Sequence, residues 1–388
     1  MQRRCRVPSA FLLLLFGCVE AQSQRHLARR LLAVPVEINS FIGTFLIDTG
    51  ANCTVIDSTF AQPLGLKPSG VASLERNYST EQSITVTADR VRFGPKLWSN
   101  VPLVVLDLSM LSRIQGIPIS GVLGTDLLTT MTLKLSFSSG KAQVITDIGD
   151  GGALVALKKV RNRYFVPVTI GPSTFEMLLD SGTNVTALSN SAWRTLPASS
   201  KQNGLIEGVQ SSGSPPGSLI ACISALHVGN VALDEIILRD HPLRVVMPSQ
   251  SGSFADTAFA GILGGDILEH FEVVLDLQHS SMYLKPDAEF RPDPYEFVTV
   301  GIQFFKPNAN EFSVAAVWKD SPAEAAGVVV GDRILSVNGH SSAGLHVEIF
   351  ANQLHGAPGT PVVIEVERAA GKFTLQMKTR QLVCESHH

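Results

Sequence analysis

The stretch FLIDTGANCTVID, residues 45–57, places an aspartate, Asp48, at the end of an apolar run. A second stretch, MLLDSGTNVTALS at residues 177–189, aligns with the first without a gap at an offset of 132 residues. Asp48 then matches Asp180, and a Val-Pro-Val tripeptide precedes each aspartate at the same distance. Two copies of this length predict a duplicated structural unit.

A second shared segment follows in each half. Gly121–Asp126 reads GVLGTD and Gly261–Asp266 reads GILGGD, at an offset of 140 residues. The larger offset means that the second half carries extra residues, which we place between 204 and 259. Apolar residues beyond each segment, at 133–137 and 273–277, predict one strand in each copy.

Composition and patterning predict mainly β-structure. The chain has 32 Gly, 21 Pro and only 17% charged residues, which favours short strands joined by turns over helical bundles. Apolar and polar residues alternate over 34–38, which predicts a hairpin that turns at Gly43 and ends in a buried arm at Asp48. Asp126 and Asp266 each precede apolar residues, and we interpret them as caps of short helices.

A carboxylate at the end of an apolar strand loses its hydration, which costs free energy unless hydrogen bonds replace it. The residues after each aspartate can supply such hydrogen bonds. Hydroxyls stand next to each aspartate, and glycines then let the backbone turn tightly and aim its N–H groups at the carboxylate. The four residues are Thr49, Gly50, Ser181 and Gly182.

If the two copies pack about a pseudo-twofold axis, Asp48 meets Asp180 and the two carboxyl groups hold one proton between them. The ionised member can take a proton from a water between them, while the protonated member donates to a peptide carbonyl as that water attacks. The pair titrates as a unit, so neither residue is permanently the acid or the base. This chemistry requires no metal, no cofactor and no covalent intermediate.

The paired motifs Asp-Thr-Gly-Ala and Asp-Ser-Gly-Thr, each followed by two hydrophobic residues and a Gly, resemble the aspartic peptidases of the retropepsin and pepsin clan. Bacterial single-chain retropepsin-like proteins are the nearest match, over residues 30–288. The resemblance implies the acid-protease fold, with two homologous closed β-lobes forming a pseudo-twofold catalytic unit. It implies catalytic residues Asp48 and Asp180, with support from Thr49, Gly50, Ser181 and Gly182.

The same resemblance implies further features of the lobes. Residues 122–124 and 262–264 should pack beneath the two catalytic loops. Flaps that close over the substrate have candidates at Glu75–Ser83 and Gly204–Gly217, which could equally be ordinary surface loops. Ala51 follows the retroviral pattern and Thr183 the pepsin pattern, so acidic and near-neutral pH optima both stay open.

After a Pro-rich stretch, SPAEAAGVVVGDRILSVNG at residues 321–339 strongly resembles a PDZ domain, especially those of exported bacterial peptidases. The resemblance covers residues 296–383. It implies a loop that binds the C-terminal carboxylate of a peptide, with the peptide adding as a strand beside a helix at Leu345–Leu354. That loop is Gly301-Ile302-Gln303-Phe304. We interpret His346 as a solvent-exposed residue of the helix.

The first residues predict export. Arginines precede a short apolar run, and Val19-Glu20-Ala21 offers a small-residue cleavage site for a signal peptide. Lipid attachment at Cys18 is the alternative, which the bulky Phe16 disfavours, and only that lipid would bring the protein to a membrane. The expected location is therefore periplasmic or secreted.

Charge and cysteine content exclude other classes. Cleavage after Ala21 leaves 28 basic and 33 acidic residues, a net charge of −5 without a basic patch, so we expect no nucleic-acid partner. The remaining Cys53, Cys222 and Cys384 are too few for a disulfide framework, and no Cys/His spacing suggests zinc.

These observations divide the chain into a signal peptide (1–21), a first lobe (22–150), a second lobe (151–288), a linker (289–295) and a PDZ domain (296–383). The leading hypothesis is an aspartic endopeptidase whose PDZ domain recruits or gates polypeptide substrates through their C-termini. The main alternative is a non-catalytic peptide-binding protein that uses the same cleft and the PDZ groove. Two further alternatives are lobes that each pair with a second chain and structural turns in a sugar-binding β-protein. Carboxylates far outside hydrogen-bonding reach of each other would favour the last.

Overall fold

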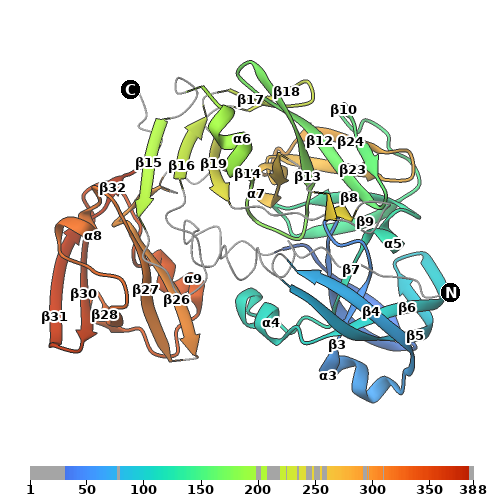
Figure 1. The fold of residues 1–388 in the computed structure, drawn as a ribbon, viewed down its shortest axis with the longest axis horizontal. Coiled ribbons are helices and arrows are strands. Elements are labelled where there is room, and N and C mark those ends of the chain that lie inside the picture. Colours follow the sequence, from blue (N-terminus) through green and yellow to red (C-terminus); the bar gives the residue numbers. More distant parts are fainter. Residues whose placement is uncertain are drawn as a thin grey trace.

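The computed structural model describes residues 31–76, 79–197, 202–207, 219–223, 225–233, 236–241, 247–248, 254–255, 260–291, 295, 297–308 and 310–383. The predicted signal peptide lies outside these residues. Within them no helix has the length and apolar character needed to cross a membrane. The chain is mainly β-structure, and the PDZ domain, orange to red in Figure 1, lies to one side of the two lobes.

The first lobe is a closed barrel of six strands. The strands follow the order β1-β2-β7-β3-β6-β5, and the ring closes where β5 pairs with β1, while β4 extends the sheet from β5. The bounds are β1 Ala33–Ile38, β2 Phe41–Ile47, β3 Val55–Asp57, β4 Lys67–Arg76, β5 Ser79–Phe93, β6 Lys96–Leu106 and β7 Gly121–Leu123. Short helices join them: α3 Ser58–Ala61, η1 Gln62–Leu64, α4 Ser109–Gln115 and α5 Thr125–Leu128.

The predicted hairpin before Asp48 is present, but its turn is not at Gly43. The chain turns at Asn39 and Ser40, which both have positive φ (47° and 76°), as a tight hairpin turn requires. Gly43 instead lies within β2, where a Cβ would approach the Cβ of Ser120 to 2.6 Å. The glycine is therefore explained by close packing and not by the turn.

The described residues of the second lobe repeat this strand order, but their strands do not form one continuous ring. Strands β12-β13-β22-β14-β19-β16 correspond in order to the six strands of the first lobe. The closing strand β5 is continuous over 15 residues, whereas its counterpart is divided between β16, which pairs with β19, and β17, which pairs with β12. The prediction of closed lobes is thus confirmed for the first lobe, and the described part of the second forms a sheet of the same order.

The elements of the second lobe have the following bounds. The strands are β11 Lys158–Val160, β12 Arg163–Ile170, β13 Ser173–Leu179, β14 Ala187–Ser189, β15 Gln202–Glu207, β16 Leu219–Ile223, β17 Leu226–Val228, β18 Val231–Leu233, β19 Ile236–His241, β20 Met247–Pro248, β21 Phe254–Ala255 and β22 Gly261–Leu263. The helices are α6 Asn190–Thr195 and α7 Gly265–Leu268.

A five-stranded sheet joins the two lobes. Its order is β10-β24-β23-β8-β9, with bounds Ala153–Ala156, Ser281–Pro286, Phe271–Asp276, Thr132–Ser136 and Lys141–Ile145. The strands predicted after each glycine segment are β8 and β23, and they pair with Lys134 opposite Val274. These two residues are equivalent at the offset of 140, so the register is centred on a pseudo-twofold axis.

The PDZ domain has its own core. Its strands are β25 Val298–Thr299, β26 Ile302–Asn308, β27 Glu311–Trp318, β28 Arg333–Val337, β29 His340–Ser341, β30 Pro361–Arg368, β31 Gly371–Lys378 and β32 Arg380–Gln381, and its helices are α8 Pro322–Ala325 and α9 Val347–Asn352. Phe304, Phe312 and Phe350 lie at the centre, with the rings of Phe312 and Phe350 stacked at 3.9 Å. The helix predicted at 345–354 is therefore present in shorter form as α9.

The PDZ domain packs against the second lobe. Strand β15 pairs with β27, with Ile206 opposite Trp318. Side chains of β16 and of the PDZ domain share one buried cluster. Cys53 and Cys222, the two cysteines among the described residues, are both disulfide-bonded and lie in different core clusters.

Candidate active site

The two aspartates occupy equivalent places at strand ends. Asp48 follows β2, and its backbone N–H donates to the carbonyl of Leu123 at 3.1 Å. Asp180 follows β13, and its N–H donates to the carbonyl of Leu263 at 3.0 Å. Strands β7 and β22 run parallel to β2 and β13 at these points, so the glycine segments support the two loops as predicted.

The structure brings the two carboxyl groups together. A Cβ placed on Gly50 would lie 2.5 Å from Cγ of Asp180, and one placed on Gly182 would lie 2.4 Å from Cγ of Asp48. Each glycine therefore packs directly against the aspartate of the other lobe, which leaves room for no larger residue. This contact counts against the alternative of structural turns in a sugar-binding β-protein, which carboxylates far apart would have favoured, and it forms within one chain.

The inner oxygen of each aspartate is fixed by its own loop. Oδ1 of Asp48 accepts hydrogen bonds from the N–H groups of Gly50 (2.7 Å) and Ala51 (2.9 Å). Oδ1 of Asp180 accepts one from the N–H of Gly182 at 2.9 Å. Both Oδ2 atoms are buried and have no donor among the described residues. The loops thus orient the carboxylates and leave the outer oxygens available for chemistry.

Burial changes the protonation of this pair. Both side chains are at most 1% exposed. Burial, followed by the negative charge of Asp180, raises the pKa of Asp48 well above its usual value. Burial raises the pKa of Asp180 to about 6. The pair therefore still holds a proton at pH values where an ordinary aspartate is ionised, as expected for adjacent carboxyl groups.

Thr49 and Ser181 connect the two loops by reciprocal hydrogen bonds. The N–H of Thr49 donates to Oγ of Ser181 at 3.1 Å, and the N–H of Ser181 donates to Oγ1 of Thr49 at 2.9 Å. Each hydroxyl then donates across to the opposite strand, to the carbonyls of Leu179 (2.8 Å) and Ile47 (2.9 Å). All four bonds are buried, so the predicted supporting hydroxyls hold the lobes in register.

Asp126 and Asp266 lie in the first turn of α5 and α7 and are not the helix caps that we predicted. The capping positions of α5 and α7 are Gly124 and Gly264, which offer no side chain. The carboxylate of Asp126 does accept the N–H of Leu127, but it also accepts the N–H and hydroxyl of Thr54, at 3.0 and 2.7 Å.

Asp266 makes the matching pair of bonds to Thr186, at 2.8 and 2.5 Å. Each aspartate thereby ties its helix to the catalytic loop of the same lobe. The sequence carried this signal, because Thr54 matches Thr186 at the first offset and Asp126 matches Asp266 at the second.

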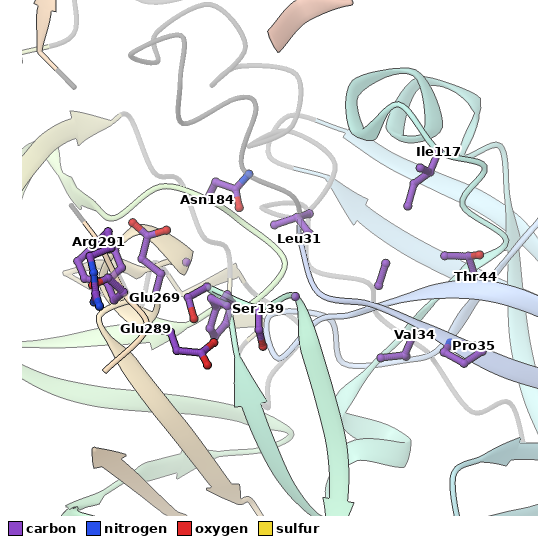
Figure 2. Close-up of a pocket in the computed structure, with 16 residues that line it drawn as sticks. Leu31, Val34, Pro35, Thr44, Ile117, Ser139, Asn184, Glu269, Glu289 and Arg291 are labelled. Atoms are coloured by element: carbon purple, nitrogen blue, oxygen red, sulfur yellow. The ribbon is translucent and has the colours of Figure 1, made fainter. Parts of the chain in front are cut away.

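A cavity of about 810 Å³ lies beside the Asp180 loop (Figure 2). Asn184 and Gly265 form its wall next to that loop, while Leu31 and Ile117 belong to the first lobe. Its remaining lining is Ala33, Val34, Pro35, Thr44, Phe137, Ser138, Ser139, Gly140, Glu269, Glu289, Phe290 and Arg291. The lining mixes apolar and polar residues, with charged side chains along one side (Figure 2). Over the part of the chain that can be described, no group of three or more His, Cys, Asp or Glu residues is placed to hold a metal ion.

The predicted flap segments belong to equivalent hairpins. Glu75–Ser83 forms the end of the β4–β5 hairpin, apart from residues 77–78, which lie outside the described residues. Gly204–Gly217 begins in β15 of the β15–β16 hairpin, and its residues 208–217 lie outside them. Both segments therefore remain flap predictions.

The predicted carboxylate loop lies at the start of β26. Gly301 has φ +84°, and a Cβ there would meet the Cβ of Ser321 at 2.4 Å, so only glycine fits. Ile302 and Phe304 point into the PDZ core. Gln303 is 2% exposed, and its Nε2 has no hydrogen-bond partner among the described residues.

Helix α9 lies close to β26. The rings of Phe304 and Phe350 are 4.6 Å apart, and Nζ of Lys306 donates to the carbonyl of Leu345 at 2.6 Å. Burial lowers the pKa of Lys306. His346, directly before α9, is exposed, as predicted.

Comparison with known proteins gives matches in both parts of the chain. The aspartyl protease family matches residues 34–127, which include the Asp48 loop and its glycine segment. The PDZ domain family matches residues 313–368.

Two curated proteins are similar over short stretches. A probable CtpA-like serine protease of Staphylococcus epidermidis is 32% identical over 83 residues, which cover 21% of this chain and 17% of that protein. A probable CtpA-like serine protease of Staphylococcus saprophyticus subsp. saprophyticus is 30% identical over 91 residues, which cover 24% and 18%. The chain thus spans less than a fifth of the length of these relatives.

A solved structure, the photosystem II D1 C-terminal processing protease, is 22% identical over 22% of this chain and 23% of its own, with a TM-score of 0.21. That TM-score is too low to bear on the fold. The family matches carry the assignment, together with the paired loops. The chain combines a retropepsin-like aspartyl protease domain with a C-terminal PDZ domain.

Proposed function

We propose that the chain is an aspartic endopeptidase in which Asp48 and Asp180 together activate a water molecule. The single observation that carries the proposal is the direct apposition of the two loops, where each glycine contacts the opposite carboxyl group. One proton shared by such a pair supplies the acid and the base that peptide hydrolysis needs.

In this proposal the reaction takes place at the Oδ2 atoms of Asp48 and Asp180, the outer oxygens of the two carboxyl groups. The ionised carboxylate takes a proton from the water, the water oxygen attacks the peptide carbonyl carbon, and the protonated carboxyl donates its proton to the carbonyl oxygen. The resulting tetrahedral diol then collapses: the carboxyl group that took the water's proton donates it to the amide nitrogen, and the C–N bond breaks. The other carboxylate takes a proton from one hydroxyl of the diol, so the carboxylic acid and the amine leave and the pair again holds one proton. Thr49 and Ser181 support this step by fixing the two loops at one separation, because their hydrogen bonds cross between the lobes.

The substrate of this reaction is a polypeptide in an extended conformation. The cavity beside the Asp180 loop, lined by both apolar and polar residues, supports binding of peptide side chains. The PDZ domain adds a site for a peptide C-terminus at Gly301–Phe304, by which it recruits or gates substrates. The basic, apolar leader favours export, so the proposed setting is periplasmic or secreted.

Cleavage of casein by the full mature chain from about pH 3 to pH 8, the range in which a carboxylate dyad holds a single proton, tests this proposal. We expect activity in the native chain and none in Asp48→Asn, with the circular dichroism spectrum of the variant unchanged. Equal activity in both proteins would overturn the mechanism. No activity in either, with peptide C-termini still bound, would favour the alternative of a peptide-binding protein.

A further inference from the structure

Trp318, at the end of β27, connects two parts of the molecule that the proposed function treats separately. Its backbone N–H donates to the carbonyl of Gly301 at 2.9 Å, at the start of the carboxylate loop. On the neighbouring strand of the second lobe, Ile206 of β15 lies opposite Trp318 in the register. One residue is therefore in contact with both the carboxylate loop and the lobe.

The side chain of Trp318 strengthens the second connection. It is 4% exposed and shares a buried cluster with Ile220 and Cys222 of β16. Ala316 belongs to the same cluster and lies directly opposite Gln303 of the carboxylate loop. The face of the PDZ sheet behind the loop therefore packs on the β15–β16 hairpin.

That hairpin extends the sheet that begins at the Asp180 loop. Strand β14 follows the loop, β19 pairs with β14, β16 pairs with β19, and β15 pairs with β16. The β4–β5 hairpin holds the equivalent place in the first lobe, where it carries the other flap candidate. Strand β15 is therefore connected through β16 and β19 to β14, the strand that follows the Asp180 loop.

The PDZ domain also contacts the first lobe. The ring of His346 lies 3.2 Å from the position of a Cβ on Gly116, at the end of α4. The next residue, Ile117, lines the cavity beside the Asp180 loop. The PDZ domain therefore contacts both lobes.

We propose that Trp318 is a positioning residue. A peptide C-terminus bound at Gly301–Phe304 fixes the conformation of the end of β27. Through its contacts with β15 and β16, Trp318 then restricts the motion of the β15–β16 hairpin. The inference rests on the proposed function, because it specifies how occupancy of the PDZ domain controls the same catalytic cleft. Coupling of this kind requires only that the docked hairpin and the bound peptide stabilise the same conformation of the last residues of β27.

Hydrogen exchange tests the coupling without relying on catalysis. The full chain carrying Asp48→Asn, which leaves peptides uncut, is exposed to a mixture of randomised hexapeptides with free C-terminal carboxylates. The same mixture with amidated C-termini is the control. We expect the free acids to slow exchange about fivefold both at residues 302–304 and at 202–207, a coupling of ordinary size.

Trp318→Ala in the same background should keep the slowing at 302–304 and lose it at 202–207. Trp318→Phe should restore the slowing at 202–207. Phe373→Ala, an aromatic truncation on another face of the PDZ domain, should leave that slowing intact. Slowing at 202–207 that survives Trp318→Ala would overturn the proposal, as would protection at 302–304 without any at 202–207. Absence of protection at 302–304 would overturn it as well.

The active chain gives the second readout. With an internally quenched substrate whose C-terminus is amidated, free-acid peptides should change kcat or KM about fivefold in the native chain and leave Trp318→Ala unchanged. Exchange coupling without any substrate cleavage would refute the proposed peptidase activity while the coupling itself stands. Cleavage that responds equally in both proteins would refute the coupling alone.

Discussion

Thr49 and Ser181 each donate a backbone N–H to the hydroxyl oxygen of the other, across two loops 132 residues apart in the chain. Each hydroxyl also donates to a strand of the opposite lobe, so both loops are held by hydrogen bonds that cross between the lobes. The relative arrangement of Asp48 and Asp180 therefore depends on the pairing of the lobes.

Replacing Thr49 with Ala should lower both stability and activity. The change leaves the buried N–H of Ser181 and the carbonyl of Leu179 without their partner, a loss of about 2 kcal/mol in the free energy of unfolding. Thr49→Ser keeps the hydroxyl and should lose much less. Urea unfolding of the single variants and of the double variant with Ser181→Ala measures the effect, and the double loss should fall short of the sum. Strict additivity would contradict the shared network.

Stability should fall between acid and neutral pH because of the aspartate pair. Burial raises the pKa of Asp180 from 3.8 to about 6, so its favourable contribution is complete below pH 3.8 and is lost as pH rises through about 6. The loss is on the order of 2–3 kcal/mol at pH 7. Asp180→Asn should flatten the pH dependence of urea unfolding in this window.

Activity should rise over the same range, because ionisation of Asp180 leaves the pair with one proton, and should fall at higher pH as Asp48 ionises. For the pH dependence of the free energy of unfolding, Asp107→Asn is a control of opposite sign. Hydrogen bonds from Ser109 lower the pKa of Asp107, so its contribution to stability is lost as the pH falls. An unchanged pH slope in Asp180→Asn would show that the pair does not hold the proton.

Gly182→Ala should remove activity more completely than it removes stability. The new methyl group would lie 2.4 Å from Cγ of Asp48 and must displace that carboxyl group. A displacement of this size commonly costs about a hundredfold in rate. Gly265→Ala is a milder control, because its Cβ would meet the carbonyl of Thr183 at 3.2 Å. Comparable kcat values for Gly182→Ala and the native chain would refute the placement of the carboxyl groups.

Asp332→Ala should destabilise the PDZ domain and leave cleavage of a short amidated peptide nearly unchanged. Asp332 is 1% exposed, and Arg368 donates two hydrogen bonds to its carboxylate. Removing Asp332 leaves a partly buried guanidinium unpaired, at a cost of about 3 kcal/mol. Differential scanning calorimetry should show the PDZ transition shifted down. A matching drop in kcat for a short amidated peptide would mean that the two units do not unfold separately.

The sequence predicted the site better than the connections around it. Asp48, Asp180 and their neighbours were predicted from two ungapped copies on the condition that the lobes pack about a pseudo-twofold axis, and the structure brings the two loops together. The contacts of Asp126 with Thr54 were missed because an aspartate at the start of a short helix is explained equally well by capping. The turn at Asn39-Ser40 was misplaced because Gly43 has a packing role that only the approach of Ser120 reveals.

Long-range backbone pairing was the least predictable feature. Two features of the second lobe depend on free strand edges. One is the division of the β5 counterpart into β16 and β17, and the other is the pairing of β15 with β27. Side-chain patterns specify the faces of a strand and leave its edges unmarked. Residues 206 and 318 are far apart in the chain, and no periodicity links them.

The pairing of Lys134 with Val274 in the sheet between the lobes has an evolutionary consequence. A register centred on equivalent residues is self-complementary: it is the isologous arrangement that a strand adopts against an identical strand. A molecule with only one such lobe would therefore already present an edge suited to its own copy. Fusion of two identical genes would join subunits that were matched beforehand, and each half could then diverge, one keeping its barrel and the other docking a new domain.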